Sequence, residues 1–168
     1  QYYEQANQWI NAQDGDFRII HYPLLPGDGI RFNWEHYYQG IEPSVFLFDK
    51  SSVSRNFGSN KIYYNILRER VGSFEKNAMG PDPDLSNSQF RSEHLYQELA
   101  KLSVKYIILH RDVDSKVGAS KTPQEAAVYL SQQKNITKVK NFGLLDIYKV
   151  EIPDNIKLLY SPQIDSQY

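Results

Sequence analysis

The stretch Leu102–Asp112, LSVKYIILHRD, decides the fold of this chain. Its centre, Tyr106–Leu109, is a continuous apolar run. Continuous rather than alternating apolar runs are typical of strands that are covered on both faces, as in parallel sheets. The preceding segment, Ser92–Leu102, places its leucines on one helical stripe and its charged residues on the other side. We therefore predict a helix that leads into a buried strand over Lys105–His110.

A second unit of the same kind opens the chain. Apolar residues recur at helical spacing from Tyr2 to Ile10, and Asp14–Asp16, with its central glycine, ends the predicted helix. The short apolar run that follows, Phe17–Tyr22, is predicted to be a strand. Because repeated helix–strand units build α/β sheets, we expect Phe17–Tyr22 and Lys105–His110 to lie side by side in one mixed sheet.

The C-terminal part predicts a helix and a hairpin. Thr122–Glu125 reads Thr-Pro-Gln-Glu, which is a helix start with a capping box. Strands are predicted over Ile136–Phe142 and Leu144–Glu151, and Gly143 between them suits a tight antiparallel turn. The predicted fold class is α/β or α+β, a mixed sheet with flanking helices and a C-terminal antiparallel hairpin. We expect one domain over residues 1–160 and a polar tail over residues 161–168.

The remaining segments have weaker patterns. Val45–Phe48 is a short apolar run that we predict to be a strand, whereas Ile30–Pro43 is aromatic and is predicted to be irregular. Three further segments have patterns of a helix, a loop and an edge strand, and these are Tyr63–Glu75, Gly80–Ser88 and Lys157–Tyr160.

Composition describes an ordinary globular chain. Its 168 residues, 40% hydrophobic and 23% charged, are sufficient for one core. A net charge of −1 offers no basic face, so we predict no nucleic-acid partner. No run approaches the ~20 apolar residues of a membrane span. Because the chain does not begin with methionine, we expect a processed product or a fragment whose membrane spans lie outside it.

The sequence contains no complete catalytic motif. The absence of cysteine excludes disulfides, thiolate catalysis and cysteine-based zinc sites. His110-Arg111-Asp112 copies the catalytic-loop tripeptide of protein kinases, but Val117 stands where that motif needs asparagine. Two patterns could suggest a metal site. Asp112 and Asp114 form a D-x-D pair, but such pairs often arise by chance, and the histidines do not have the spacing of metal ligands. We therefore predict neither a metal site nor a cofactor.

One set of polar residues points to a ligand site. His110, Arg111 and Asp112 leave the C-terminal end of a buried strand, which is the edge where open α/β sheets bind ligands. An arginine can hold a phosphate or a carboxylate through a two-pronged contact. If the predicted strands are parallel neighbours, the residues that join these three are Asp49, Ser51, Ser52, His21 and Tyr22. The alternative is a local ion pair between Arg111 and Asp112 in a solvated loop.

The aromatic segment around Trp34 is a second candidate. Its rings could form a platform for stacking sugars at the border of the strand-end site. The alternative is that Phe32 and Trp34 bury their rings to pin an irregular loop to the domain. Asp28 and Glu35 lie beside these rings in the sequence, and they are candidates for the paired carboxylates of glycoside hydrolysis.

Three blocks in this order carry a resemblance. They are Trp9-Ile-Asn with the following Gly-Asp and Phe-Arg-Ile, then Leu102–Ile108, then Phe142–Val150. The blocks resemble the soluble domain of polytopic GT-C-like membrane glycosyltransferases and of uncharacterised relatives, among them membrane proteins related to 6-pyruvoyl-tetrahydropterin synthase. Catalysis of the GT-C type uses acidic residues in loops between membrane spans. Those spans are not in this sequence, so the resemblance assigns no catalytic residue.

The resemblance implies a non-catalytic extracytoplasmic accessory domain of a membrane glycosyltransferase-like protein, tethered by spans outside this chain. Its implied partner is the transmembrane portion of its own parent protein, and its implied ligand is a glycan or a polyprenyl-linked sugar. The alternative is a self-contained enzyme that processes sugars or phosphates in a cleft at the C-terminal ends of the strands. For either function the candidate ligand-binding residues are Asp49, His110, Arg111, Asp112 and Trp34.

Overall fold

The computed structural model describes residues 1–22, 30–36, 38–40, 44–53, 95–114 and 122–152. The segments Tyr63–Glu75, Gly80–Ser88 and Lys157–Tyr160, for which the sequence predicts a helix, a loop and an edge strand, lie outside the described residues, as does the polar tail.

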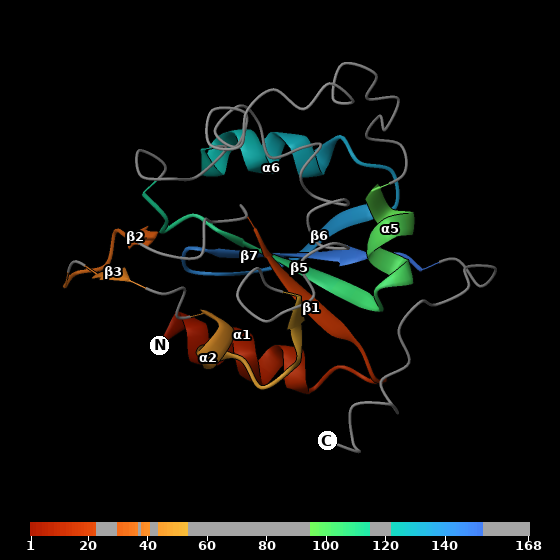
Figure 1. Ribbon diagram of the computed structural model, residues 1–168, viewed down its shortest axis with the longest axis horizontal. Helices are drawn as coiled ribbons and strands as arrows, with labels where there is room; N and C mark the ends of the chain where they lie inside the picture. Colours follow the sequence, from red (N-terminus) through yellow and green to blue (C-terminus); the bar gives the residue numbers. More distant parts are fainter. Residues whose placement is uncertain (23–29, 37, 41–43, 54–94, 115–121, 153–168) are drawn as a thin grey trace, which may run out of the picture.

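The described chain contains a mixed five-stranded sheet (Figure 1). From one edge to the other, its strands are β4 (Ser52–Val53), β1 (Arg18–Tyr22), β5 (Val104–His110), β7 (Leu145–Val150) and β6 (Ile136–Phe142). β4, β1 and β5 are parallel, while β7 pairs antiparallel with both β5 and β6. The predicted neighbours Phe17–Tyr22 and Lys105–His110 are therefore adjacent in one mixed sheet, and the hairpin supplies an antiparallel edge, as predicted.

The hairpin turn packs against the N-terminal end of the chain. Gly143 has a φ of +54°, a left-handed conformation that glycine adopts without steric cost. A Cβ atom at this position would lie 3.0 Å from both Cβ and Cγ of Tyr2. The turn between β6 and β7 is thus held close to the first helix, and this contact positions one wall of the site described below.

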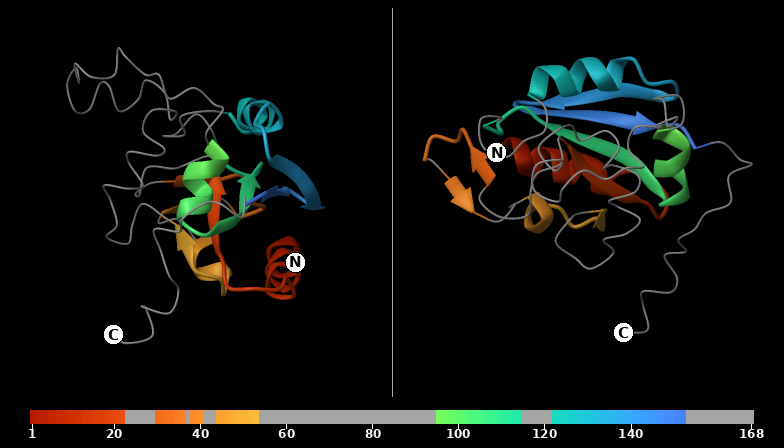
Figure 2. Two further views of the ribbon diagram at one scale, coloured as in Figure 1. Left: turned by 90° about the vertical axis from the view of Figure 1, so that its right-hand side faces the viewer. Right: turned by 45° about the horizontal axis from the view of Figure 1, so that its top comes forward.

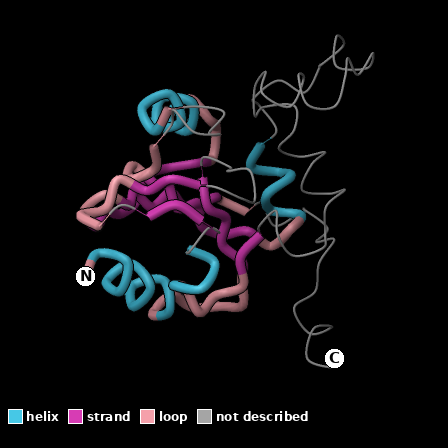
Figure 3. Tube along the Cα trace, turned by 60° about the vertical axis from the view of Figure 1, so that its left-hand side comes forward, coloured by secondary structure: helices cyan, strands magenta, loops and turns pink. Residues whose placement is uncertain are grey.

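Helices cover both faces of the sheet, which gives a three-layer arrangement (Figures 1 and 2). α1 (Tyr2–Asn11) covers one face, and α5 (Leu95–Lys101) and α6 (Pro123–Ser131) cover the other. The tube in Figure 3 shows the same separation, with the strands between α1 and α6. The predicted capping box of α6 is confirmed, because the Thr122 side chain accepts from the Glu125 backbone N–H and Glu125 bonds back to Thr122.

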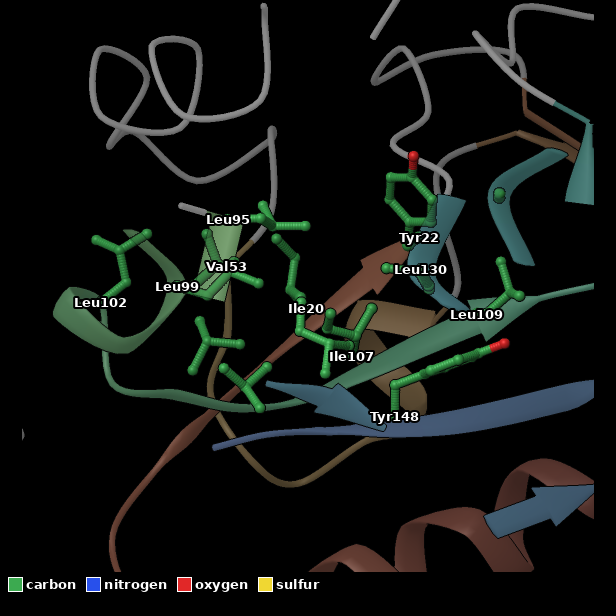
Figure 4. Close-up of a cluster of buried hydrophobic side chains, with 14 residues drawn as sticks. Ile20, Tyr22, Val53, Leu95, Leu99, Leu102, Ile107, Leu109, Leu130 and Tyr148 are labelled. Atoms are coloured by element: carbon green, nitrogen blue, oxygen red, sulfur yellow. The ribbon is translucent and has the colours of Figure 1, made fainter. Parts of the chain in front are cut away.

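Two hydrophobic clusters fill the space between the layers. The cluster beneath α5 and α6 is drawn in Figure 4 and includes Ile20, Leu99 and Ile107. The cluster beneath α1 includes Ile19 and Ile108. Successive strand residues alternate between the two clusters because side chains alternate across a strand. The residues at the centre of these clusters are at most 2% exposed, and they include Ile19, Leu99, Ile107 and Ile108.

Two segments differ from the prediction. The apolar run Val45–Phe48 is not a strand, since Ser44–Leu47 forms the one-turn helix α2 and β4 begins only at Ser52. An apolar run of four residues has no periodicity long enough to separate a helical turn from a strand. The aromatic segment is also more regular than predicted, because β2 (Ile30–Phe32) and β3 (Tyr38–Gly40) form a separate antiparallel pair.

No helix among the described residues combines the length and the apolar character that crossing a bilayer requires.

Candidate functional site

Strand alternation directs two histidines towards α1. Ile19 and Ile108 pack in the cluster beneath α1. His21 and His110 each lie two residues further along the same strands, so they share that face. Both imidazoles are buried, with exposed fractions of 3% for His21 and 0% for His110. The histidines that the sequence placed at the strand-end edge are therefore internal to the domain.

A chain of hydrogen bonds runs through these histidines across three strands. Ser52 Oγ lies 3.2 Å from His21 Nε2, and His21 Nδ1 lies 2.9 Å from His110 Nε2. His110 Nδ1 lies 3.1 Å from the hydroxyl of Tyr3 on α1, and that hydroxyl donates to Asp112 Oδ2 at 2.8 Å. The chain therefore joins the ends of β1 and β5 to Ser52, which begins β4 rather than following a strand as predicted.

Tyr3 sets the direction of this chain. Its only hydroxyl proton is donated to the Asp112 carboxylate, so towards His110 the oxygen of Tyr3 accepts. A neutral His110 would carry its proton on Nδ1 and accept at Nε2 from His21 Nδ1–H. His21 Nε2 would then accept from the Ser52 hydroxyl. In this arrangement every bond from Ser52 to Asp112 points the same way.

Asp112 is the anchor of the site. Its Oδ2 atom accepts hydrogen bonds from the hydroxyls of Tyr2 and Tyr3, at 2.9 and 2.8 Å, and from Trp34 Nε1–H at 2.7 Å. The residue is 1% exposed. Its other oxygen, Oδ1, has no hydrogen-bond partner among the described residues and lies 3.6 Å from His110 Nδ1. A single buried carboxylate oxygen thus holds the polar ends of three aromatic side chains.

The charge states of these groups follow from burial and from each other. Burial alone would raise the pKa of Asp112, but the proximity of His110 and the hydrogen bonds from Trp34 and Tyr3 outweigh it and lower the pKa to about 2. Burial and the Asp112 charge raise the pKa of the Tyr2 phenol, so Tyr2 remains a donor. Burial, followed by His110, holds the pKa of His21 well below its usual value. The site is therefore an ionised carboxylate whose Oδ2 atom accepts from two phenols and an indole.

A short bridge between β2 and the segment after β5 brings Trp34 to Asp112. Phe32 pairs antiparallel with Val113, and the backbone N–H of Asn33 donates to the Asp112 carbonyl at 2.7 Å. Phe32 is fully buried, and its ring centroid lies 4.9 Å from that of Trp34. Packing against Phe32 anchors the segment, as the structural alternative for this region supposed, while Trp34 stays partly exposed.

A pocket opens beside this cluster. Its volume is about 360 Å³, and the described residues that line it are Tyr2, Tyr3, Asn33, Trp34, Glu35 and Leu144. Three of these are the aromatic side chains that donate to Asp112. Leu144 belongs to the hairpin turn that packs against Tyr2. The wall of the pocket is therefore made of rings whose polar ends are fixed from behind, and such preformed, mostly apolar hollows are typical of small-ligand sites.

Arg111 does not join this pocket. Its guanidinium donates to the Gly143 carbonyl and lies 3.4 Å from Asp146 Oδ2. Asp146 is 3% exposed and is also contacted by Lys138, at 2.8 Å, and by Asn141, at 2.6 Å. Arg111 thus takes part in an ion pair, as the structural alternative proposed, but its partner is Asp146 rather than Asp112.

Asp49 also lies elsewhere. Its carboxylate accepts from the side-chain amides of Asn7 and Asn11, at 3.0 and 2.6 Å, and its backbone N–H donates to Asn7. Asp49 follows the helical turn α2 rather than a strand, so the premise that placed it at the strand ends was wrong. The structure brings together His110, Asp112 and Trp34 of the five candidates, and it places Arg111 and Asp49 in other contacts.

No signal in the sequence indicated the role of Tyr2 and Tyr3. Both lie in the first turn of α1, where the apolar spacing includes Tyr2 but not Tyr3, and their partner Asp112 is 110 and 109 residues away. Glu35 was a candidate for another reason, as a hydrolytic carboxylate, and Asp28, its predicted partner, lies outside the described residues. Among the described residues, no three His, Asp or Glu side chains are grouped closely enough to hold a metal ion.

Comparison with known proteins shows a similarity of fold. No family model and no curated protein sequence matches the chain. Among solved structures, the arabinofuranosyltransferase AftD from Mycobacteria matches 92% of this chain with a TM-score of 0.63 and 16% identity. A mutant of that enzyme matches the same share with a TM-score of 0.60 and 16% identity. The chain spans only 12% and 13% of those two chains. Its described α/β architecture is therefore similar to one segment of a much larger arabinofuranosyltransferase chain.

Proposed function

We propose that this chain is a non-catalytic, extracytoplasmic accessory domain of a membrane glycosyltransferase-like protein, and that its aromatic pocket binds a glycan. The observation that carries the proposal is the fold match, which takes in 92% of this chain but only 12% of the arabinofuranosyltransferase. A match that takes in most of the shorter chain and a small part of the longer one is expected of a module within a larger protein. The membrane tether and the remainder of the parent protein would lie outside this chain.

The composition of the pocket supports a sugar as the ligand. Sugar rings present flat C–H faces that pack on aromatic rings, and Tyr2, Tyr3 and Trp34 provide such rings. Asn33 and Glu35 are exposed at the same pocket and offer an amide and a carboxylate to ligand hydroxyls. A volume of about 360 Å³ lies within the range of small-ligand pockets.

The state of Asp112 supports binding without turnover. A general acid or base needs a pKa near the working pH and access to the substrate. The Asp112 carboxylate has a pKa of about 2, is buried, and is occupied by three donors on one oxygen. Its role in the proposal is to position the rings of the pocket rather than to react.

The proposal is tested by measuring glycan binding and turnover with the same protein. We expect glycan-array binding that is lost in Trp34→Ala and retained in the matched variant Trp9→Ala, because Trp9 packs against Tyr106 and Phe142, away from the pocket. Activated sugar donors and glycosides should show no turnover above buffer. Glycan binding that survives Trp34→Ala, or steady turnover that is abolished by Asp112→Asn, would refute the proposal.

One observation favours a second candidate, a self-contained enzyme. The chain Ser52–His21–His110 places a hydroxyl next to an imidazole, an arrangement that also activates nucleophiles. Two features make it the weaker candidate. The pKa of His21 is held well below its usual value by burial, which makes it a poor base, and Ser52 is not among the described residues that line the pocket. Hydrolysis of acyl or phosphoryl esters that disappears in Ser52→Ala would establish this candidate.

A further inference from the structure

We infer that the pocket selects uncharged sugars and rejects ligands that carry a phosphate or a carboxylate. This inference rests on the proposed function, because it takes the pocket to be the glycan site. It chooses between the two ligands that the sequence left open, a neutral glycan and a polyprenyl-linked sugar recognised through its phosphate.

The hydrogen-bond donors on the aromatic rings of the pocket are already bound to Asp112. Tyr2 and Tyr3 each have one hydroxyl proton and Trp34 has one N–H, and all three are donated to Asp112 Oδ2. Anion sites in proteins are built from N–H and O–H donors that point at the ligand. Here the donors point away from the pocket, into the domain, so what the rings offer a ligand is their faces.

The backbone amide at the centre of the lining is committed as well. The N–H of Asn33 donates to the Asp112 carbonyl at 2.7 Å. The exposed polar side chains of the described lining are Asn33, whose amide donates and accepts, and Glu35, whose carboxylate accepts. Sugar hydroxyls donate as well as accept, whereas ionised phosphate and carboxylate groups only accept. The Asn33 amide and the Glu35 carboxylate together therefore suit a polyhydroxylated ligand.

Two carboxylates lie at the described part of the pocket. Glu35 is the charged side chain in the described lining, and the ionised Asp112 lies directly behind the three rings. Aromatic faces also carry the negative side of the ring quadrupole. A phosphate or carboxylate in the pocket would face repulsion from both carboxylates and weak repulsion from the rings.

The cation expected to receive an anion is engaged elsewhere. Arg111 follows the same strand as Asp112, but its guanidinium contacts the Gly143 carbonyl and Asp146. Lys138 contacts the opposite oxygen of Asp146. Releasing Arg111 to bind a phosphate would remove one cation from a carboxylate that is 3% exposed, and that loss opposes the rearrangement.

The experiment follows the two tryptophan indole N–H signals in a ¹H–¹⁵N spectrum of the 168-residue chain. Trp34→Phe identifies the Trp34 signal, and Trp9 serves as the internal control. The neutral probes are oligomers of arabinofuranose and of mannose. The charged probes are oligomers of galacturonic acid and farnesyl phosphate, which separate a carboxylate-bearing sugar from a phosphate-bearing lipid.

We expect the neutral oligomers to shift the Trp34 signal and the charged probes to bind at least about tenfold more weakly, which corresponds to about 1.4 kcal/mol. Glu35→Lys should narrow this difference by making galacturonate bind severalfold more tightly, while Asp16→Asn, a charge change at an exposed site outside the lining, should leave it unchanged. Galacturonate or farnesyl phosphate binding as tightly as the neutral oligomers would overturn the selectivity but not glycan binding. A Trp34 signal that no probe shifts would overturn the proposed function itself.

Discussion

Two buried carboxylates, Asp112 and Asp146, lie near the same end of the sheet but are stabilised in different ways. Their exposed fractions are 1% and 3%. Asp146 is contacted by two cations, Arg111 and Lys138, and by the Asn141 amide. Asp112 receives only neutral donors on Oδ2, from two phenols and an indole.

The comparison distinguishes a carboxylate whose charge is compensated by cations, Asp146, from one that orients the rings around it, Asp112. The cations that compensate Asp146 have partly exposed side chains, 39% for Arg111 and 46% for Lys138, so water and salt weaken their contribution. The donors of Asp112 are rigid rings that line a pocket, and they leave its negative charge in place. Asp146 holds the hairpin through its ion pairs, whereas Asp112 orients the rings of the pocket and keeps a negative charge behind them.

The largest effect is expected when the Asp112 cluster, made of Asp112 and its donors Tyr2, Tyr3 and Trp34, is disrupted. Asp112→Ala leaves three aromatic donors without their acceptor, and each buried unsatisfied donor costs about 1–3 kcal/mol. Because the rings can turn partly towards water, we expect a loss of about 3–5 kcal/mol in the free energy of unfolding, measured by urea denaturation. A loss below about 1 kcal/mol would show that the aromatic cluster does not depend on this carboxylate.

Ile108→Ala provides the matched apolar change on the same face of β5, the strand that Asp112 follows. Ile108 is fully buried in the cluster beneath α1, and its truncation should cost about 2–5 kcal/mol through lost burial and the cavity left behind. The two variants should differ in the indole spectrum rather than in stability. Asp112→Ala should move the Trp34 N–H signal, and Ile108→Ala should leave it in place; an unchanged melting temperature in Ile108→Ala would remove this strand from the core.

As pH falls, the first loss in the free energy of unfolding should come from His21, which lies next to His110 behind the Asp112 cluster. The folded state keeps His21 neutral because its pKa is depressed, whereas the unfolded chain binds a proton below about pH 6.5. Stability is therefore present above pH 6.5 and should fall below it by up to about 1.4 kcal/mol per pH unit. The contribution of Asp112 is present above its usual pKa of 3.8 and is lost only as pH falls towards about 2. His21→Asn should flatten the slope between pH 6.5 and 4.5; an unaltered slope would assign it to other groups.

A smaller effect is expected for the second carboxylate. Asp146→Asn removes the partner of Arg111 and Lys138 and should cost about 1–2 kcal/mol at low salt. The difference from wild type should shrink as sodium chloride rises from about 0.05 to 0.5 M, where the Debye length shortens. The loss caused by Asp112→Ala should barely change over the same range. Equal salt dependence of the two variants would contradict the distinction drawn between the two sites.

The smallest effect is expected at Thr122, which is remote from both carboxylates and therefore serves as a reference. Thr122→Ala removes the side-chain cap of α6 and should cost about 1 kcal/mol, with little dependence on salt and with both indole signals unchanged. Thr122→Ser keeps the capping oxygen and should cost less than half as much, and a larger loss in the serine variant would show that the hydroxyl bond is not the source of the effect.

The parts of the fold that the sequence predicted are those with local signals. The apolar run of β5, the capping box of α6 and the glycine of the hairpin each specify their element within a few residues. The adjacency of β1 and β5 in one mixed sheet followed from the repeated helix–strand order. The error at Val45–Phe48 has the opposite cause, since four apolar residues fit a helical turn and a strand equally well.

The site was only partly predictable because its contacts are long-range. The strand-end position of His110 and Asp112 was visible in the sequence, but the donors to Asp112 come from the first turn of α1 and from the segment after β2. Nothing local to Tyr2 distinguishes a phenol that donates to a buried carboxylate from one that covers a core. The position of Arg111 depended on Asp146, whose burial is set by the pairing of β7 with β5 and β6.

The one-way hydrogen bonds from Ser52 to Tyr3 have a consequence for how the domain responds to a single added proton. An imidazolium at His110 would donate from both nitrogens, so His21 would have to accept at Nδ1 and carry its own proton on Nε2. The Ser52 hydroxyl would then turn from donor to acceptor. One proton taken up beside Asp112 would thus be read out two strands away as the rotation of a hydroxyl group, and the ¹⁵N shifts of His21 would record the exchange of its tautomers.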